Sequence, residues 1–371
     1  MIKVLELFGG IGACSKALEK LGIEYEIADY VEIDKYAVQS FNAMHGTDFK
    51  PQDVREWNKD IAVDLIMHGS PCQDFSIAGK QAGGDKDSGT RSSLMYETLR
   101  IVEKIKPKYV IWENVKNILS KKHYHNFLDY FDTINKLGYV TFYEVLNAKD
   151  FGIPQNRERV FTISIRDDVY VDTIDAKNKR FYFPKPYPLE KKLKDFLEEN
   201  VNEKYYISNK QLHGMMVTNY SSYKLSALLR DKNDIANTIK ARFEGNPQLV
   251  EDESLLIKTN NKKGFDEAKL YDSINIQFPS SKTRRGRVGH QVAQTLQTSD
   301  NMAVVESVKN YQIRKLTPKE CWRLMGFEDS DFEAARAAGV SNTQLYKQAG
   351  NSIVVNVLEE IFKILLENYL W

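Results

Sequence analysis

Short apolar runs alternate with helical patterns over roughly the first 165 residues of the chain. Five runs rich in β-branched and aromatic residues predict strands, at residues 2–8, 24–33, 63–69, 108–115 and 159–165. Between them lie helical patterns, for example at residues 92–106, where apolar side chains recur every three or four positions. This alternation predicts an α/β fold with a doubly wound, mostly parallel sheet that has helices on both faces.

The alternation ends near residue 183. A proline-rich segment, residues 183–188, leads into a polar stretch without steady periodicity. This change predicts a second, smaller, loop-rich domain over residues 186–345. Residues 351–366 then carry one apolar stripe and predict a terminal helix that docks on the first sheet. We therefore expect a first domain built from residues 1–185 and 346–371, which the chain leaves and rejoins.

Capping signals at both ends predict one helix in the second half of the chain. Thr317 is a natural N-cap, Pro318 takes the first helical position, and Glu320 completes a capping box. Gly326 supplies a left-handed end. The sequence therefore predicts a short helix between these residues.

The composition is typical of a soluble globular protein, and 371 residues are enough for two domains. The sequence has no run of 18 apolar residues and starts directly with a strand pattern, so we expect neither a membrane span nor a signal peptide. Its three cysteines, Cys14, Cys72 and Cys321, have no zinc or disulfide spacing. We therefore expect no metal and a reducing, cytoplasmic location.

A glycine-rich turn follows the first predicted strand and opens a helix. Gly9, Gly10 and Gly12 allow a ligand to approach the backbone, and Glu32 follows at the end of the second strand. An acid there can accept both ribose hydroxyls of a nucleoside. The GGxG spacing suits a pyrophosphate less than a nucleoside without phosphates, such as S-adenosylmethionine. Asp53 could accept a hydrogen bond from the adenine amino group, or be an ordinary turn residue.

Cys72 stands in GSPCQDFS, directly after the third predicted strand, and Pro71 stiffens its approach. A free cysteine is often buried and inert. This one, however, lies beyond the carboxyl end of a strand, where open α/β sheets bind their ligands. The position favours a nucleophile, because a thiolate is intrinsically very nucleophilic.

Three further charged residues fall at the ends of predicted strands. Glu113 follows the apolar run at residues 108–112, so burial could keep its carboxyl protonated and able to donate a hydrogen bond. Arg157 and Arg159 would share one face of an extended segment. An exposed strand edge with ordinary salt bridges is an equally good interpretation of the two arginines.

The densest positive cluster is KTRRGR, with Lys282, Arg284, Arg285 and Arg287 within six residues. The net charge of the whole chain is only +1, so any basic surface must be local. The cluster suits an anionic partner, and a solvated loop explains it equally well.

Six segments of the chain together resemble the cytosine-5 DNA methyltransferases of bacteria and phages. They are ELFGGIG, GSPCQDFS, WENV, QNRERVF, LTPKECWRLMGF and QAGNSIVVNVL, which stand in the family's order and span residues 6–358. The resemblance implies a Rossmann-like class I methyltransferase fold with a target-recognition domain. It also implies S-adenosylmethionine as the methyl donor and double-stranded DNA as the partner, and we expect a monomer with no obligate protein partner.

The resemblance also implies roles for individual residues. Cys72 would attack cytosine C6, Glu113 would protonate N3, and Arg159 and Arg157 would bind O2 and the loop around it. The residues expected to surround S-adenosylmethionine are Phe8, Gly9, Gly10, Gly12, Glu32, Ile33, Asp53, Val54, Leu94, Asn351 and Ser352. Residues 73–91 are similar to the family's mobile catalytic loop. Thr295 and Leu296 are similar to the Thr-Leu pair of the recognition region, and with the KTRRGR cluster they are expected to contact DNA.

Other functions fit parts of this pattern. A tRNA cytosine-5 methyltransferase would keep the same catalytic residues, and the long, individual recognition region with its basic cluster favours DNA over tRNA. A catalytically inactive, DNA-binding relative is disfavoured by the intact Cys72 and Glu113. An amino-methyltransferase would need a D/N-P-P-Y/F motif, which is absent from the sequence.

Overall fold

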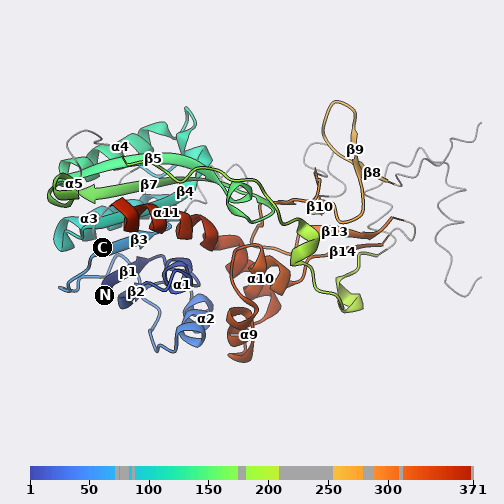
Figure 1. Ribbon diagram of the computed structural model, residues 1–371, viewed down its shortest axis with the longest axis horizontal. Helices are drawn as coiled ribbons and strands as arrows, with labels where there is room; N and C mark the ends of the chain where they lie inside the picture. Colours follow the sequence, from blue (N-terminus) through green and yellow to red (C-terminus); the bar gives the residue numbers. More distant parts are fainter. Residues whose placement is uncertain are drawn as a thin grey trace, which may run out of the picture.

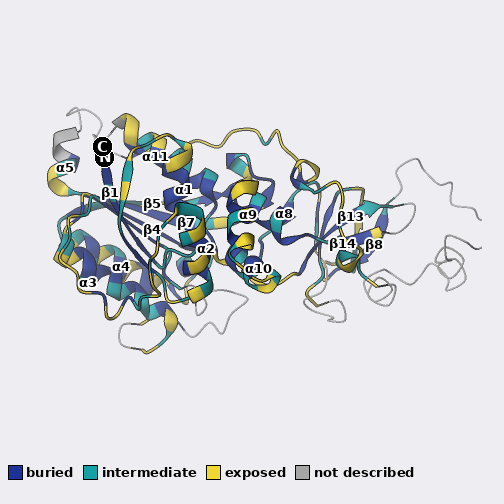
Figure 2. Cartoon of the chain, turned by 90° about the horizontal axis from the view of Figure 1, so that it is seen from below, coloured by how far each residue is buried: buried dark blue, intermediate teal, exposed yellow. Residues whose placement is uncertain are grey.

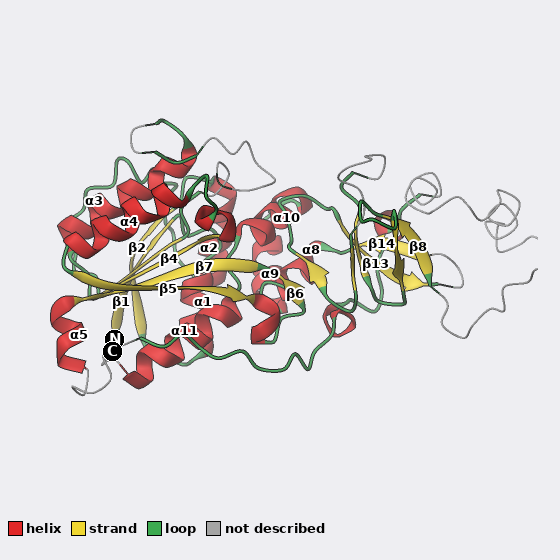
Figure 3. Ribbon diagram, turned by 90° about the horizontal axis from the view of Figure 1, so that it is seen from above, coloured by secondary structure: helices red, strands yellow, loops and turns green. Residues whose placement is uncertain are grey.

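The structure, a computed structural model, describes residues 1–71, 75, 83–85, 88–173, 181–208, 254–278, 287–308 and 312–368. The described part is elongated, with a six-stranded sheet at one end and a four-stranded sheet at the other (Figure 1). Between the sheets lie α8 (Pro318–Arg323), α9 (Asp329–Ala337) and α10 (Asn342–Asn351) (Figure 3). Within the described residues, no helix is long and apolar enough to cross a membrane.

The large sheet has the strand order β2-β1-β3-β4-β7-β5. Its strands are β1 (Ile2–Leu7), β2 (Tyr25–Val31), β3 (Leu65–His68), β4 (Tyr109–Val115), β5 (Tyr139–Asn147) and β7 (Glu158–Arg166). The β7 strand alone runs in the direction opposite to the other five strands, so the predicted mostly parallel sheet is confirmed. All five predicted strands are present. The sixth, β5, was not predicted: it lies at the edge of the sheet, and its middle is exposed at Tyr143 and Glu144.

Helices cover both faces of this sheet, as the sequence predicts. On one face lie α1 (Ala13–Lys20) and α11 (Val355–Asn368), and on the other α3 (Met95–Ile105) and α4 (Tyr124–Lys136) (Figure 3). The α2 helix (Lys35–His45) packs beside β2. Side chains alternate along β4. Tyr109 and Ile111 pack in the core on the side of α1 and α11, and Val110 and Trp112 pack in the core on the side of α3 and α4. The strands are therefore buried on both sides (Figure 2).

The end signals of α8 are confirmed, and the terminal helix needs a correction. Thr317 and Glu320 form the predicted capping box, and Gly326 has a φ of 85°. The predicted helix at residues 351–366 is in fact two elements, because α10 ends at Asn351 and α11 starts only at Val355. Ser352 has an extended backbone that breaks the helix, so Ile353 leaves the apolar stripe and lines a cleft instead.

The small sheet has a core of its own. Its order is β11 (Val288–Gly289), β10 (Ser273–Asn275), β13 (Met302–Ser307) and β14 (Gln312–Lys315), and a hairpin of β8 (Leu255–Lys258) and β9 (Phe265–Ala268) packs against it. The β13 strand faces two ways. Ala303 and Val305 enter the small core, whereas Met302 and Val304 enter the core that α8, α9, α10 and α11 share with the large sheet.

A buried ion cluster joins the small sheet to α8. The Arg314 guanidinium on β14 is fully buried and donates two hydrogen bonds of 2.8 Å to the Glu320 carboxylate, which is also fully buried. Arg314 also pairs with Glu306. Glu320 accepts from the backbone N–H of Thr317 and of Glu198, both at 2.8 Å. The helix cap and the ion pair therefore share one carboxylate.

We predict that Arg314→Met lowers the free energy of unfolding by about 3–5 kcal/mol, because Glu320 is left as an uncompensated buried charge. The neighbouring Lys315→Met is the matched control. Lys315 forms a partly exposed pair with Asp300, so removing its charge should cost less than about 1 kcal/mol. Denaturant unfolding of both variants measures the difference. Equal destabilisation by the two substitutions would contradict a special role for the buried cluster.

Candidate active site

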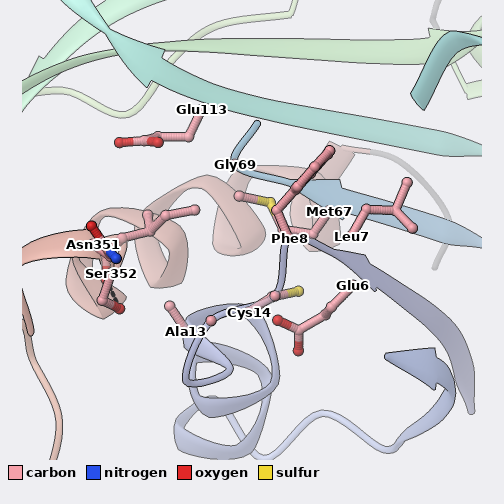
Figure 4. Close-up of a pocket in the computed structure, with 13 residues that line it drawn as sticks. Glu6, Leu7, Phe8, Ala13, Cys14, Met67, Gly69, Glu113, Asn351 and Ser352 are labelled. Atoms are coloured by element: carbon pink, nitrogen blue, oxygen red, sulfur yellow. Dashed lines mark hydrogen bonds between the residues drawn. The ribbon is translucent and has the colours of Figure 1, made fainter. Parts of the chain in front are cut away.

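A cleft opens at the carboxyl ends of the parallel strands (Figure 4). It is lined by the end of β1, the glycine turn, the start of α1, the residues that follow β3, the end of β4, and the break between α10 and α11. The lining residues are Glu6, Leu7, Phe8, Gly9, Gly10, Ala13, Cys14, Met67, Gly69, Glu113, Asn351, Ser352 and Ile353. Segments from both ends of the chain therefore meet at this edge of the sheet.

The glycine turn has the geometry that the sequence predicts. Gly10 and Gly12 have φ values of 55° and 77°, in the left-handed region that favours glycine. At Gly9 a Cβ atom would lie 2.6 Å from the Tyr30 ring, so a side chain has no room there. The Gly10 N–H donates to Glu32 Oε2 at 3.1 Å. The turn and the acid at the end of β2 are thus brought into direct contact.

Around Glu32 the surface is suited to a nucleoside. Burial raises the pKa of Glu32 above its ordinary value, and the N–H groups of Asp34 and Gly10 oppose that shift. The next residue, Ile33, is apolar and 66% exposed. A carboxylate beside an exposed aliphatic side chain can bind ribose hydroxyls and cover an adenine ring.

Six of the predicted cofactor residues lie outside the cleft lining: Gly12, Glu32, Ile33, Asp53, Val54 and Leu94. Val54 is buried, and Leu94 packs against the core that contains it. The Asp53 carboxylate is engaged by Arg55, which donates from its backbone N–H at 3.0 Å and from its guanidinium at 2.5 Å. An adenine amino group would have to share Asp53 with that ion pair.

Glu6 lines the cleft and was not among the predicted site residues. Its carboxylate is buried and accepts hydrogen bonds from the backbone N–H of Ser15, at 3.0 Å, and from the Ser15 hydroxyl. Burial raises its pKa to about 7, although the two Ser15 bonds act in the opposite direction. The sequence signal was an acid inside the apolar run IKVLELF.

On the opposite wall, Glu113 meets Arg159. The Glu113 side chain points into the cleft from the end of β4 (Figure 4), and Arg159 Nε lies 3.0 Å from its Oε1. Burial raises the pKa of Glu113 above its ordinary value, and the positive charges of Arg159 and Arg157 oppose that shift. The carboxyl is therefore held in place by a cation and disposed to keep its proton.

Arg157 is directed elsewhere. Its buried guanidinium donates to the carbonyl of Leu296 at 3.2 Å, of Gly350 at 3.0 Å and of Ser352 at 2.6 Å. These carbonyls belong to the segment between β12 and β13, to the last turn of α10, and to the break between α10 and α11. Arg157 thus joins three distant parts of the chain, whereas Arg159 meets the cleft acid.

Cys72 lies outside the described residues, as do Lys282, Arg284 and Arg285. The other two cysteines are free, and burial raises the pKa of the Cys14 and Cys321 thiols well above the ordinary value. Neither is suited to form a thiolate. Gly69, three residues before Cys72, lines the cleft.

The predicted DNA-contacting residues that are described differ in exposure. Arg287 is exposed. The Thr295 hydroxyl donates to the Asn156 carbonyl at 2.7 Å, and the Leu296 side chain is buried. They follow β12 (Ala293–Gln294), which pairs in parallel with β6 (Gln155–Asn156). The Thr-Leu pair is therefore docked against the segment that carries Arg157.

The sheet, the glycine turn with Glu32, and a cleft that carries a buried acid beside an arginine define a Rossmann-like α/β methyltransferase. Residues 2–367 match the family model for the C-5 cytosine-specific DNA methylases, and the chain belongs to this family. The protein is accordingly a DNA cytosine-5 methyltransferase.

Curated relatives agree over nearly the full length. The chain is 32% identical to the orphan methyltransferase M.SPRI of Bacillus phage SPR, covering 100% of this chain and 98% of the relative. It is 31% identical to the type II methyltransferase M.HhaI of Haemophilus parahaemolyticus, covering 97% and 93%. A solved structure of Spodoptera frugiperda DNMT2 has a TM-score of 0.62 at 19% identity, covering 99% and 100%, which supports the fold.

We predict a pH dependence of stability that originates at Glu6. Because its pKa is raised from 4.5 to about 7, the protonated carboxyl contributes stability that is fully present below about pH 4.5 and is lost as the pH rises through about 7. The isosteric Glu6→Gln removes this titration. The free energy of unfolding of the wild type, relative to Glu6→Gln, should fall by about 3 kcal/mol between pH 4.5 and pH 8.

Denaturant unfolding of both proteins across this range measures the effect. A difference between the two proteins that does not change with pH would mean that Glu6 ionises at its ordinary pKa in the folded state.

Proposed function

We propose that Cys72, Glu113 and Arg159 carry out methyl transfer from S-adenosylmethionine to C5 of a cytosine that is flipped out of duplex DNA. The observation that carries this assignment is the buried Glu113 carboxyl, held by Arg159 at 3.0 Å and facing the cleft beside the segment that leads to Cys72. The family's activity requires a protonating group and a nucleophile at one base, and these residues supply them.

The cleft fits S-adenosylmethionine. A Cβ at Gly10 would meet nothing within 4 Å, so that side of the glycine turn is open to a ligand. Glu32 would bind the ribose hydroxyls, Ile33 would cover the adenine, and Phe8, Asn351 and Ser352 would enclose the methionine end. The bound cofactor would supply an electrophilic methyl group on a sulfonium. Val54 and Leu94 would support the pocket from behind, since they lie in the core beside it.

The residues then act on the pyrimidine ring in order. The Cys72 thiolate forms a bond to C6 while Glu113 gives its proton to N3, so that the C5–C6 electron pair becomes available at C5. Arg159 holds Glu113 and faces the position of O2. After the methyl group is bound to C5, a base removes the C5 proton, the Cys72–C6 bond breaks, and the N3 proton returns to Glu113.

The raised pKa of Glu113 suits this role, because burial favours the protonated carboxyl, which can donate to N3. The nucleophile and the acid must approach the ring from different directions. Neither approach is open inside a stacked duplex, so the cytosine must leave the helix.

The remaining predicted residues are assigned to DNA binding and to the docking of the recognition region. The KTRRGR cluster would hold phosphates, with Arg285 or Arg287 the residue that reaches a groove. Thr295 would lie next to the DNA. Leu296 and Arg157 would hold the recognition region against the catalytic region, because both are buried at that junction. We further propose that the protein works as a monomer in the cytoplasm.

We predict that Cys72→Ala abolishes methylation and leaves the dissociation constant for S-adenosylmethionine within about twofold of wild type, because the thiol is not part of the glycine turn. Wild-type protein should also form a covalent adduct with a duplex that carries 5-fluorocytosine at every cytosine, since fluorine cannot leave C5 as a proton does. Methyl transfer and gel-shift under denaturing conditions measure the two effects. Cys321→Ala is the control and should keep both activities; turnover by Cys72→Ala would refute the assignment.

We also predict that Lys282→Ala/Arg284→Ala weakens binding to all duplexes alike. The slope of log K against log salt should fall by about 0.9 for each phosphate that the variant no longer neutralises. The methylated motif, read from the DNA of cells that express the variant, should stay the same and be less completely filled. Lys3→Ala/Lys108→Ala removes two charges at the opposite edge of the sheet and should change neither property. Methylation of additional or altered sequence motifs by the variant would instead mean that the cluster contacts base edges and determines sequence specificity.

A further inference from the structure

The segment that carries Glu113 also holds the chain just before Cys72. Glu113 faces the cleft, and its neighbour Trp112 points to the other side of β4. There the fully buried Trp112 Nε1 donates to Ser70 Oγ at 2.9 Å. Asn114 Nδ2 lies 3.4 Å from both Ser70 Oγ and the Ser70 carbonyl. Ser70 is buried and precedes Cys72 by two residues.

The same segment reaches the chain after Cys72 as well. Asn117, in the short helix η2 (Lys116–Leu119), donates from Nδ2 to the Phe75 carbonyl at 2.6 Å. The Phe75 ring is fully buried and packs edge-on against His123, with 5.3 Å between ring centroids. At Gly84 a Cβ would lie 2.3 Å from that ring, so Phe75 is enclosed on this side too. Phe75 follows Cys72 by three residues.

We propose that Trp112 and Asn117 are positioning residues that hold Ser70 and Phe75, the described neighbours of Cys72 in the chain, against the strand end that carries Glu113. The inference rests on the proposed role of Cys72 as the nucleophile. The thiolate and the carboxyl act on two atoms of one ring, so their separation must be held within about 0.5 Å. Because Ser70 and Phe75 are both bonded to residues 112–117, a shift of the β4 end moves Glu113 together with these two neighbours of Cys72.

A purely structural role for a buried tryptophan would affect stability and not the chemical step in particular. The kinetic test therefore separates adduct formation from binding and from folding. It measures the single-turnover rate of covalent adduct formation with 5-fluorocytosine duplex, the dissociation constants for the cofactor and the duplex, and the melting temperature.

The variants remove single donors or acceptors. Trp112→Phe and Ser70→Ala delete the two ends of one hydrogen bond, and Asn117→Ala deletes the other anchor. Each should slow adduct formation by about 10- to 100-fold, the range expected from a small displacement of a reacting group. The dissociation constants should change by less than about twofold.

The double variants test whether two anchors exist. Trp112→Phe/Ser70→Ala should be no slower than the slower of its two single variants, because both remove the same bond. Trp112→Phe/Asn117→Ala should be slower than either single variant. Trp322→Phe is the matched control: its Nε1 donates to the Leu345 carbonyl at 3.0 Å in an equally buried place away from the cleft. It should lower the melting temperature without slowing adduct formation.

Two results would overturn the inference alone: wild-type adduct rates in the anchor variants, or a slowing of the same size in Trp322→Phe. If the wild-type protein forms no adduct, or if Cys72→Ala still methylates DNA, the role of Cys72 fails and the inference falls with it.

Discussion

The buried guanidinium of Arg157 is the interaction on which the arrangement of the cleft depends. It donates to the Leu296, Gly350 and Ser352 carbonyls, which come from segments nearly 140 and 200 residues further along the chain. A buried cation is tolerated only when its donors are satisfied, so these carbonyls cannot move apart without a large cost. The break between α10 and α11, which forms one wall of the cleft, is thereby fixed against the start of β7.

Much of this architecture could be predicted from the sequence, because it follows from local patterns. The parallel strands, the glycine turn, the capping box of α8 and the position of Glu113 all depend on residues close together in the chain. The edge strand β5 escaped prediction because its half-exposed middle lacks a buried pattern. The break at Ser352 escaped because an apolar stripe continues across it.

The contacts that local patterns could not predict are those whose geometry depends on how whole elements pack together. Glu320 is recognisable as a capping residue, but its bidentate partner Arg314 lies on a strand whose place depends on the whole fold. The split between Arg157 and Arg159 has the same origin, since neither the carbonyls around one nor the acid beside the other is local.

Three acids at the carboxyl ends of the strands have pKa values that burial raises and that different neighbouring groups lower. Burial raises the pKa of Glu6, Glu32 and Glu113. The opposing groups differ: a serine at Glu6, backbone amides at Glu32 and arginine side chains at Glu113. Each acid therefore has a counter-group of its own.

The strand β13 packs into a core on each of its faces, which has a consequence for how the sequence of the small sheet can change. Met302 and Val304 belong to the core of the catalytic region, while Ala303 and Val305 belong to the small sheet. A substitution on either face of β13 therefore disturbs a packed interior, and on one face that interior is shared with the catalytic machinery. The buried side chains of the hairpin β8–β9 pack only in the core of the small sheet. We therefore expect the sequence of the small sheet to diverge more in the hairpin, which packs in one core, than in β13, which packs in two.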